Sequence, residues 1–210
     1  RSADRSPKAP CVTDESDDTP DAADTEALIA HLLARHSVGP RHLVEPGPGE
    51  AELRLAVRAA LRAPDHYRLV PYRFVVIPAE RRDQLAALFE GSARRAGQPD
   101  DKVREEAQRA RNGPTLVALA ARIDPDHPQV PQREQWICVG AALSNFMNVL
   151  HLMGFGAKLL SGRKAADPEI ARALCEDGET LVGWIVIGTP RTRPRPRDED
   201  DDPARVLRRW

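Results

Sequence analysis

Three short stretches of the sequence carry side chains that suit the binding of an anion or a planar ring. Arg35-His36-Ser37 offers a planar guanidinium, an imidazole and a hydroxyl, a set that suits phosphate. In Arg62-Ala63-Pro64-Asp65-His66, the proline should end a helix and place the acidic and imidazole side chains on a loop. Ser161-Gly162 follows a short strand pattern, and such a turn can present backbone N–H groups to a ligand.

Each stretch also has an ordinary structural explanation. Basic residues at Arg35 and His36 would stabilise the C-terminus of a helix through its macrodipole. Asp65 could serve only to shape a helix exit, and Ser161-Gly162 could be a simple turn. Taken singly, none of the three stretches distinguishes a ligand-binding role from a structural one.

Several other chemistries lack their motifs. The sequence has no GxxxxGK[ST] loop, no GxSxG elbow and no HExxH helix. Gly154-Phe155-Gly156 lacks the third glycine of a dinucleotide fingerprint and follows a predicted helix rather than a strand. His127 lies in a predicted loop, where we expect an exposed side chain, because a stable metal site needs three or four ligands. We therefore predict no metal site and identify no catalytic nucleophile or base.

Composition predicts a single globular domain with no global attraction to polyanions. The 210 residues are 41% hydrophobic, and the formal net charge is -1. No apolar run is long enough to span a bilayer, and no signal-peptide core is visible. The three cysteines form no CxxC pair, and Cys138 and Cys175 lie in apolar helical patterns, where we expect plain core residues. We expect a cytoplasmic protein with neither a nucleic-acid nor a membrane partner.

The periodicity of apolar residues predicts an α+β fold, in which helices surround a small sheet. Helices are predicted at 27–33, 53–61, 79–96, 100–111 and 132–153, and a short one after Asp167-Pro168-Glu169. Strands are predicted at 73–77, 114–123, 157–160 and 181–187.

The two ends of the chain differ in composition from the middle. Residues 1–22 are poor in aliphatic side chains, and we predict a disordered tail. Residues 23–190 form the predicted domain, and 191–210 are an Arg/Pro-rich and acidic extension. A basic extension could act as an interaction module, but the acidic run beside it disfavours nucleic acid.

Taken in order, the three stretches resemble motifs of the nitroreductase family, most closely those of its minimal single-domain subgroup. That subgroup carries an Arg-Arg-Ser opening, an Arg-Ala-Pro-Asp-His turn and a Trp-Arg-Ser-Gly turn. The resemblance covers about residues 25–190, and its most specific part is 61–66 followed by 71–77. Ser144-Asn145, Gly154-Phe155-Gly156 and residues 182–190 resemble further family landmarks.

The resemblance implies a mostly antiparallel sheet, a homodimer, and FMN bound at the subunit interface. It also implies that NAD(P)H is the co-substrate and that a nitroaromatic or quinone-like acceptor is reduced in ping-pong fashion. Protein acid or base groups need not be prominent in such a reaction, because the cofactor carries the chemistry.

The same resemblance assigns roles to individual residues. The phosphate and ribityl end of FMN would be held by Arg35, His36 and Ser37. The partner subunit would contribute its own copies of Arg62 and His66. The ring would lie near Ser161 and Gly162, and a basic residue after the last strand, Arg191 or Arg193, would meet the phosphate.

The sequence departs from the family pattern in three places. His36 replaces the second Arg, Leu159-Leu160 replaces Trp-Arg, and the loop at 38–45 is slightly longer. Loss of a charge-assisted phosphate contact costs roughly 1.5–3 kcal/mol. Either Arg163 and Lys164 compensate from just downstream, or the chain is a flavin-binding protein with weakened or lost turnover.

Overall fold

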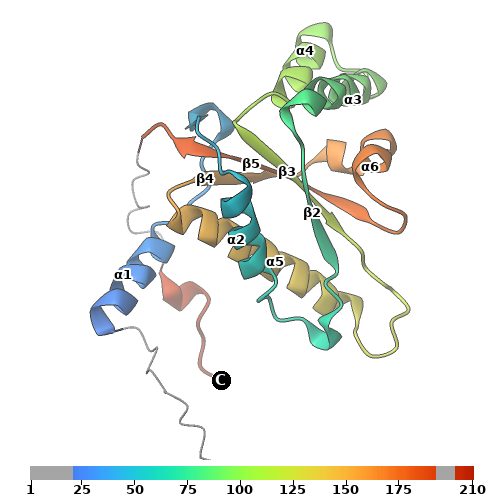
Figure 1. The fold of residues 1–210 in the computed structure, drawn as a ribbon. Coiled ribbons are helices and arrows are strands. Elements are labelled where there is room, and N and C mark those ends of the chain that lie inside the picture. Colours follow the sequence, from blue (N-terminus) through green and yellow to red (C-terminus); the bar gives the residue numbers. More distant parts are fainter. Residues whose placement is uncertain (1–20, 193–201) are drawn as a thin grey trace, which may run out of the picture.

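A five-stranded sheet forms the centre of the fold, and helices lie on both of its faces (Figure 1). The computed structural model describes residues 21–192 and 202–210. The α-helices are α1 (Ala22–Leu33), α2 (Glu50–Ala60), α3 (Arg82–Arg95), α4 (Asp100–Arg109), α5 (Gln132–Leu152) and α6 (Pro168–Leu174). The strands are β1 (Leu43–Val44), β2 (Tyr72–Val76), β3 (Thr115–Ala121), β4 (Gly156–Leu160) and β5 (Thr180–Pro190). Short 3₁₀ turns lie at Pro40–His42, His66–Arg68, Ala79–Arg81, Arg163–Ala166 and Pro203–Arg205.

Every strand pair in the sheet is antiparallel, so the predicted α+β class with an antiparallel sheet is confirmed. The strand order is β1-β5-β3-β2, and β4 also pairs with β5. β5 continues to Pro190, beyond the predicted end at Ile187, because Gly188 pairs with Gly156 and the last two residues pair with β1. β1 was not predicted from the sequence, because two residues show no periodicity.

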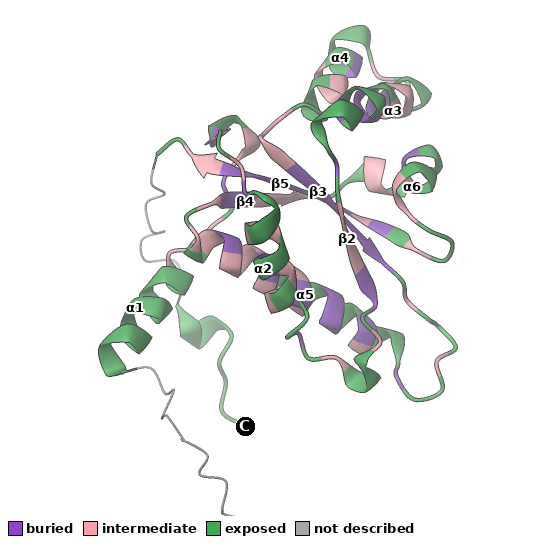
Figure 2. Ribbon diagram, viewed as in Figure 1, coloured by how far each residue is buried: buried purple, intermediate pink, exposed green. Residues whose placement is uncertain are grey.

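The two faces of the sheet carry two apolar cores (Figure 2). Val117, Leu119 and Ile185 belong to the core that includes α2 and α5 residues. Leu116 and Trp184 belong to the core that includes α3 and α6 residues. β3 is therefore buried on both faces, which explains its continuous run of apolar residues.

α1 projects from the body of the molecule (Figures 1 and 2). Asp21 caps the helix by accepting a hydrogen bond from the Asp24 N–H, so the helix begins at Ala22. Its predicted apolar face buries no residue, and Leu33 is 80% exposed. Residues 1–20 of the predicted tail and 193–201 of the predicted extension, Arg193 included, lie outside the described residues.

Two sequence predictions for single residues need correction. His127 is half-buried, and its Nδ1 accepts hydrogen bonds from the N–H groups of Gln129 and Val130. It therefore shapes its own turn. Cys175 follows α6 as its C-cap residue instead of lying within a helix, whereas Cys138 is buried in α5 as predicted.

Candidate functional site

The Arg35-His36-Ser37 stretch lies beside the start of β4. The N–H of Val38, the next residue, donates to the carbonyl of Ala157 at 3.1 Å. Arg191 follows β5 at the same end of the sheet, and its N–H donates to the carbonyl of His42 at 2.8 Å. The predicted phosphate residues and Arg191 thus lie at one end of β4.

Gly156 allows these segments to meet. A Cβ at this position would lie 2.8 Å from Leu43 Cδ2, and 3.0 Å from both Pro190 Cγ and Val38 Cγ2. These contacts leave no room for a larger residue. The convergence of the chain around Gly156 holds the turn at 35–37 near the end of β5.

Arginine and imidazole side chains gather at this end of the sheet. Burial lowers the pKa of His151, and the nearby Arg35, His31 and His36 lower it further. His151 also hydrogen-bonds the carbonyl of His31 at 2.9 Å. Within residues 21–192 and 202–210, neither Arg35 nor Arg191 forms an ion pair. Two arginines without carboxylate partners suit an anion such as phosphate.

His31 and His151 also belong to this group, although the sequence did not predict it. The two residues lie on α1 and α5, 120 positions apart. Neither forms a motif with Arg35 that spacing along the chain could reveal.

Ser161 and Gly162 lie at the other end of β4, and both are exposed. Gly162 has φ +154°, and a Cβ built there would meet no atom within 4 Å. Gly183 of β5 packs against this turn, where a Cβ would lie 2.5 Å from the Leu160 carbonyl. Ala157 and Ser161 are four positions apart, about 13 Å at the strand rise. The open turn and the cationic group therefore stand at opposite ends of one strand.

Arg62 and His66 lie elsewhere. His66 Nδ1 is 3.0 Å from Oε2 of Glu134, a residue in the first turn of α5. Arg35 instead lies near His151, which is in the last turn of the same helix. Glu134 and His151 are 17 positions apart, about 25 Å along a helix. Within one chain, the structure does not bring Arg62 and His66 to the turn at 35–37.

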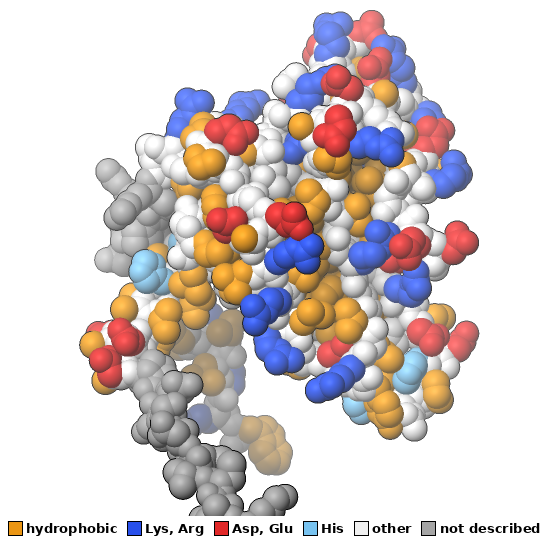
Figure 3. Space-filling view, in the orientation of Figure 1, with side chains coloured by type: hydrophobic (Ala, Val, Ile, Leu, Met, Phe, Trp, Pro, Cys, Tyr) orange, Lys and Arg blue, Asp and Glu red, His pale blue; other side chains and the backbone are white. Residues whose placement is uncertain are grey.

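Asp65 holds the loop that carries His66. Its carboxylate accepts hydrogen bonds from the N–H of Leu69 at 3.1 Å and of Val70 at 2.8 Å. Tyr67 and Val70 have φ +65° and +46°, in the left-handed region that ordinary residues rarely adopt. Asp65 thus stabilises the conformation of this loop, and Arg62 and His66 remain exposed to solvent beside it. Figure 3 shows Lys and Arg side chains gathered over the C-terminal end of α2.

Leu159 and Leu160 replace the Trp-Arg pair of the family pattern. Both are apolar, and both pack against apolar residues. Leu159 packs against the core on the α2–α5 face, and Leu160 against the core on the other face. Lys164, expected to compensate, forms an ion pair with Glu106 and lies 4.2 Å over the Phe89 ring. Its charge is already engaged, whereas Arg163 is exposed and forms no ion pair within the described part of the chain.

The residues present fit FMN in two respects. Unpaired cations at one end of β4 suit a phosphate, and the bare backbone at Gly162 leaves space for a flat ring at the other end. The described residues contain no group of three or more His, Cys, Asp or Glu side chains that could hold a metal ion. None of the helices described is long and apolar enough to cross a membrane.

Comparison with known proteins gives consistent results. A model of the nitroreductase family matches residues 32–189. The Escherichia coli K12 protein named "Putative NAD(P)H nitroreductase YdjA" is 32% identical over 175 residues, which are 82% of this chain and 93% of that protein. A Haemophilus influenzae protein named "Putative NAD(P)H nitroreductase" is 27% identical over 71% of this chain and 82% of its own length.

Solved structures share the fold. A nitroreductase-like family protein from Bacillus cereus superposes with a TM-score of 0.72 at 18% identity, over 87% of this chain and 95% of that one. A structure from Desulfovibrio desulfuricans, described as "a putative nitroreductase in complex with fmn", superposes with a TM-score of 0.64 at 19% identity, over 87% of this chain and 96% of that one. With a family model that covers most of the sequence and a relative 32% identical over nearly its whole length, this chain belongs to the nitroreductase family.

Proposed function

We propose that this protein is an FMN-dependent oxidoreductase that uses NADH or NADPH to reduce nitroaromatic or quinone-like acceptors. The observation that carries the proposal is the pairing, along β4, of an unpaired cationic group with an open glycine turn. The names of the relatives and the FMN in the Desulfovibrio desulfuricans structure support the same assignment.

In this proposal, each predicted residue binds or orients the cofactor. The phosphate is held by Arg35, His36 and Ser37, with Arg191 beside them. The ring rests at Ser161 and Gly162, where no side chain intervenes. FMN, when bound, would supply the redox chemistry between the nicotinamide and the acceptor in two half-reactions. The protein residues named here supply hydrogen bonds and charge, and none acts as a nucleophile.

Arg62 and His66 enter the proposal through a second subunit. The exposed face of α5 carries Trp136, Ile137, Gly140, Ser144 and Leu152, at helical spacing. If two copies of α5 packed antiparallel about a two-fold axis near position 142, Glu134 of one would lie near His151 of the other. That arrangement would bring the partner's His66 to Arg35, which one chain alone cannot do.

The exposed apolar residues of α1 support the same homodimer. Leu28, Ile29, Leu32 and Leu33 are between 44% and 80% exposed, and α1 contacts α5 near His151. Several exposed large apolar side chains on one helix are a common mark of a protein interface.

The colour of the purified protein and its turnover test the proposal together. We expect a yellow protein that releases FMN on denaturation, and that oxidises NADH or NADPH when a quinone is added. The second candidate is a flavin binder with lost turnover, which the burial of Leu159 and Leu160 against apolar cores favours. Bound FMN without NAD(P)H consumption would select that candidate, and a colourless protein that does not bind added FMN would refute both.

A further inference from the structure

A cavity of about 260 Å³ lies between α3, α4 and the turn at Ser161-Gly162. Its apolar wall includes Phe89, Leu116 and Trp184, which come from α3 and from the sheet face opposite α5. The rings of Phe89 and Trp184 meet edge to face, with centroids 5.0 Å apart. The volume is slightly below that of typical ligand pockets, so it suits a single-ring molecule.

The polar wall of this cavity contains three cationic side chains and one carboxylate. Lys164, Arg109 and Arg163 contribute cations to the lining. Glu106 is the carboxylate of the lining, and it pairs with Lys164 and with Arg109 Nη1 at 3.0 Å. Arg109 also pairs with Glu105 at 3.0 Å, whereas Arg163 forms no ion pair within the described part of the chain. An entering anion would share Lys164 and Arg109 with these glutamates and would also meet Arg163, so the lining favours an anionic or acceptor-rich group.

One buried donor and one half-buried cation support an acceptor-rich ligand in this cavity. Trp184 is 4% exposed, and its indole Nε1–H has no hydrogen-bond partner, the one such buried side-chain atom among the residues that the structure describes. Buried donors are nearly always paired, so an unpaired one calls for a reason. The Lys164 side chain is only 21% exposed, held over the Phe89 ring between the apolar and polar walls.

We propose that this cavity binds a small aromatic carboxylate, with the ring between Phe89 and Trp184 and the carboxylate toward Lys164 and Arg109. The site lies on the opposite face of the sheet from α5 and does not require FMN, although Ser161 and Gly162 border it. It adds to the flavin site proposed above a second place where a small molecule binds.

Calorimetric titration of the purified protein with benzoate and with benzamide tests the proposal, because the two differ in charge but little in shape. We expect benzoate to bind at least tenfold more tightly than benzamide, both before and after FMN is added. Equal affinities, no benzoate binding, or loss of benzoate binding on addition of FMN would overturn the proposal.

Matched variants locate the interaction. Lys164→Met should weaken benzoate at least tenfold and leave benzamide unchanged. Lys102→Met removes a comparable lysine–glutamate pair on α4 that does not line the cavity, and should change neither. If Lys164→Met does not fold, Ala96→Leu at the exposed rim of the cavity should weaken both ligands. Equal effects of the two lysine variants, or an unchanged Ala96→Leu protein, would contradict the assignment.

Trp184 provides a readout that is independent of enzyme activity. Benzoate should shift the indole N–H resonance of Trp184, identified by its loss in Trp184→Phe, and not those of Trp136 or Trp210. A shift confined to the other two would place the ligand elsewhere. FMN content, measured separately, keeps the two proposals distinct, because a colourless protein that binds benzoate refutes only the flavin assignment.

Discussion

At the scale of single residues, Arg35 and Lys164 show how neighbours decide what a cation can do. Lys164 already pairs with Glu106, so another anion must share it. Arg35 has no carboxylate partner among the described residues, so an anion gains its full charge-assisted hydrogen bonds. From residue type alone, Arg35 and Lys164 would be expected to bind an anion equally well.

Arg35→Ala should weaken FMN binding. Loss of one charge-assisted contact costs roughly 1.5–3 kcal/mol, about one to two decades of affinity. Quenching of FMN fluorescence on titration with apoprotein measures the change. Arg172→Ala, an exposed arginine on α6, serves as control and should bind FMN as the unaltered protein does. Equal losses in both variants would remove Arg35 from the site.

Asp167 should make stability depend on pH at the acidic end. Burial alone would raise its pKa, but hydrogen bonds from Ser92, Arg95 and two backbone N–H groups lower it to about 2. Because the folded pKa lies below the ordinary 3.8, the stabilisation is complete above about pH 4 and is lost as the pH falls toward 2.

Asp167→Ala removes both this charge and the N-cap of α6, and should lower the free energy of unfolding at pH 7 by ~1–2 kcal/mol. Urea unfolding at pH 7, 5, 4 and 3 should show the difference from the unaltered protein shrinking below pH 4. A difference that stays constant across this range would rule out the proposed titration.

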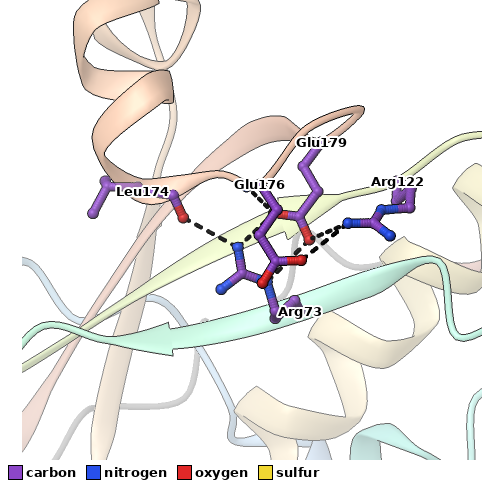
Figure 4. A network of polar contacts seen from close by, with 5 residues as sticks. All are labelled: Arg73, Arg122, Leu174, Glu176 and Glu179. Atoms are coloured by element: carbon purple, nitrogen blue, oxygen red, sulfur yellow. Dashed lines mark hydrogen bonds and ion pairs between the residues drawn. The ribbon is translucent and has the colours of Figure 1, made fainter.

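At the scale of elements, ion pairs tie the edge strand β2 to the segment before β5 (Figure 4). Arg73 donates to both carboxylate oxygens of Glu179 at 3.0 and 2.5 Å, and to the carbonyl of Leu174 at 3.3 Å. Arg122 and Glu176 extend the network. The hydrogen bond from Arg73 is the main reason why the pKa of Glu179 is lowered. The network joins segments that lie about 100 residues apart in sequence.

Glu179→Gln should lower the free energy of unfolding by ~1–2 kcal/mol, since the Glu179 side chain is 5% exposed but Arg73 is partly open to solvent. Glu176→Gln is the matched control: that side chain is 61% exposed, and the loss should be less than half as large. Denaturant unfolding at pH 7 measures both. A larger loss of unfolding free energy for Glu176→Gln would mean that the exposed ion pair contributes more to stability than the buried one.

The exposed face of α5 should determine the oligomeric state. Ile137, 63% exposed, lies within this face, and Ile137→Glu should convert a dimer into a monomer with weakened FMN binding. Light scattering after size exclusion measures the mass. Val76→Glu places the same charge at an exposed position on β2 and should leave the dimer intact. A dimeric Ile137→Glu protein would exclude the proposed packing of α5.

At the scale of the whole molecule, the two halves of the proposed flavin site lie near opposite ends of a 21-residue helix. A single chain cannot bring the two halves together, whereas a two-fold dimer completes two such sites. The arrangement makes flavin binding a property of the pair of chains.

Mixed dimers test this directly. When Arg35→Ala and His66→Ala chains with different tags are combined, one site in each mixed dimer carries both changes and the other carries neither. We expect one FMN bound per two chains with the affinity of the unaltered protein. Parent homodimers of each variant should bind weakly at both sites. A mixed dimer as weak as its parents would show that both residues serve the same site from one chain.

Much of the architecture follows from local pattern. The apolar spacing of 132–153 predicts α5 almost to the residue, and Asp167-Pro168-Glu169 predicts the start of α6, because caps and periodicity act within a few residues. β1 escaped prediction because its two residues are held by pairing with Thr189 and Pro190, far along the chain.

The sequence by itself determined which residues offer chemistry, the order of the three motifs and the family that they resemble. Only the tertiary structure decided that Arg35 lies with His31 and His151, that Lys164 is engaged by Glu106, and that His66 is about 25 Å along α5 from that group. The reason is physical: local pattern fixes helices and strands, whereas the packing of distant segments fixes which side chains meet and which face solvent.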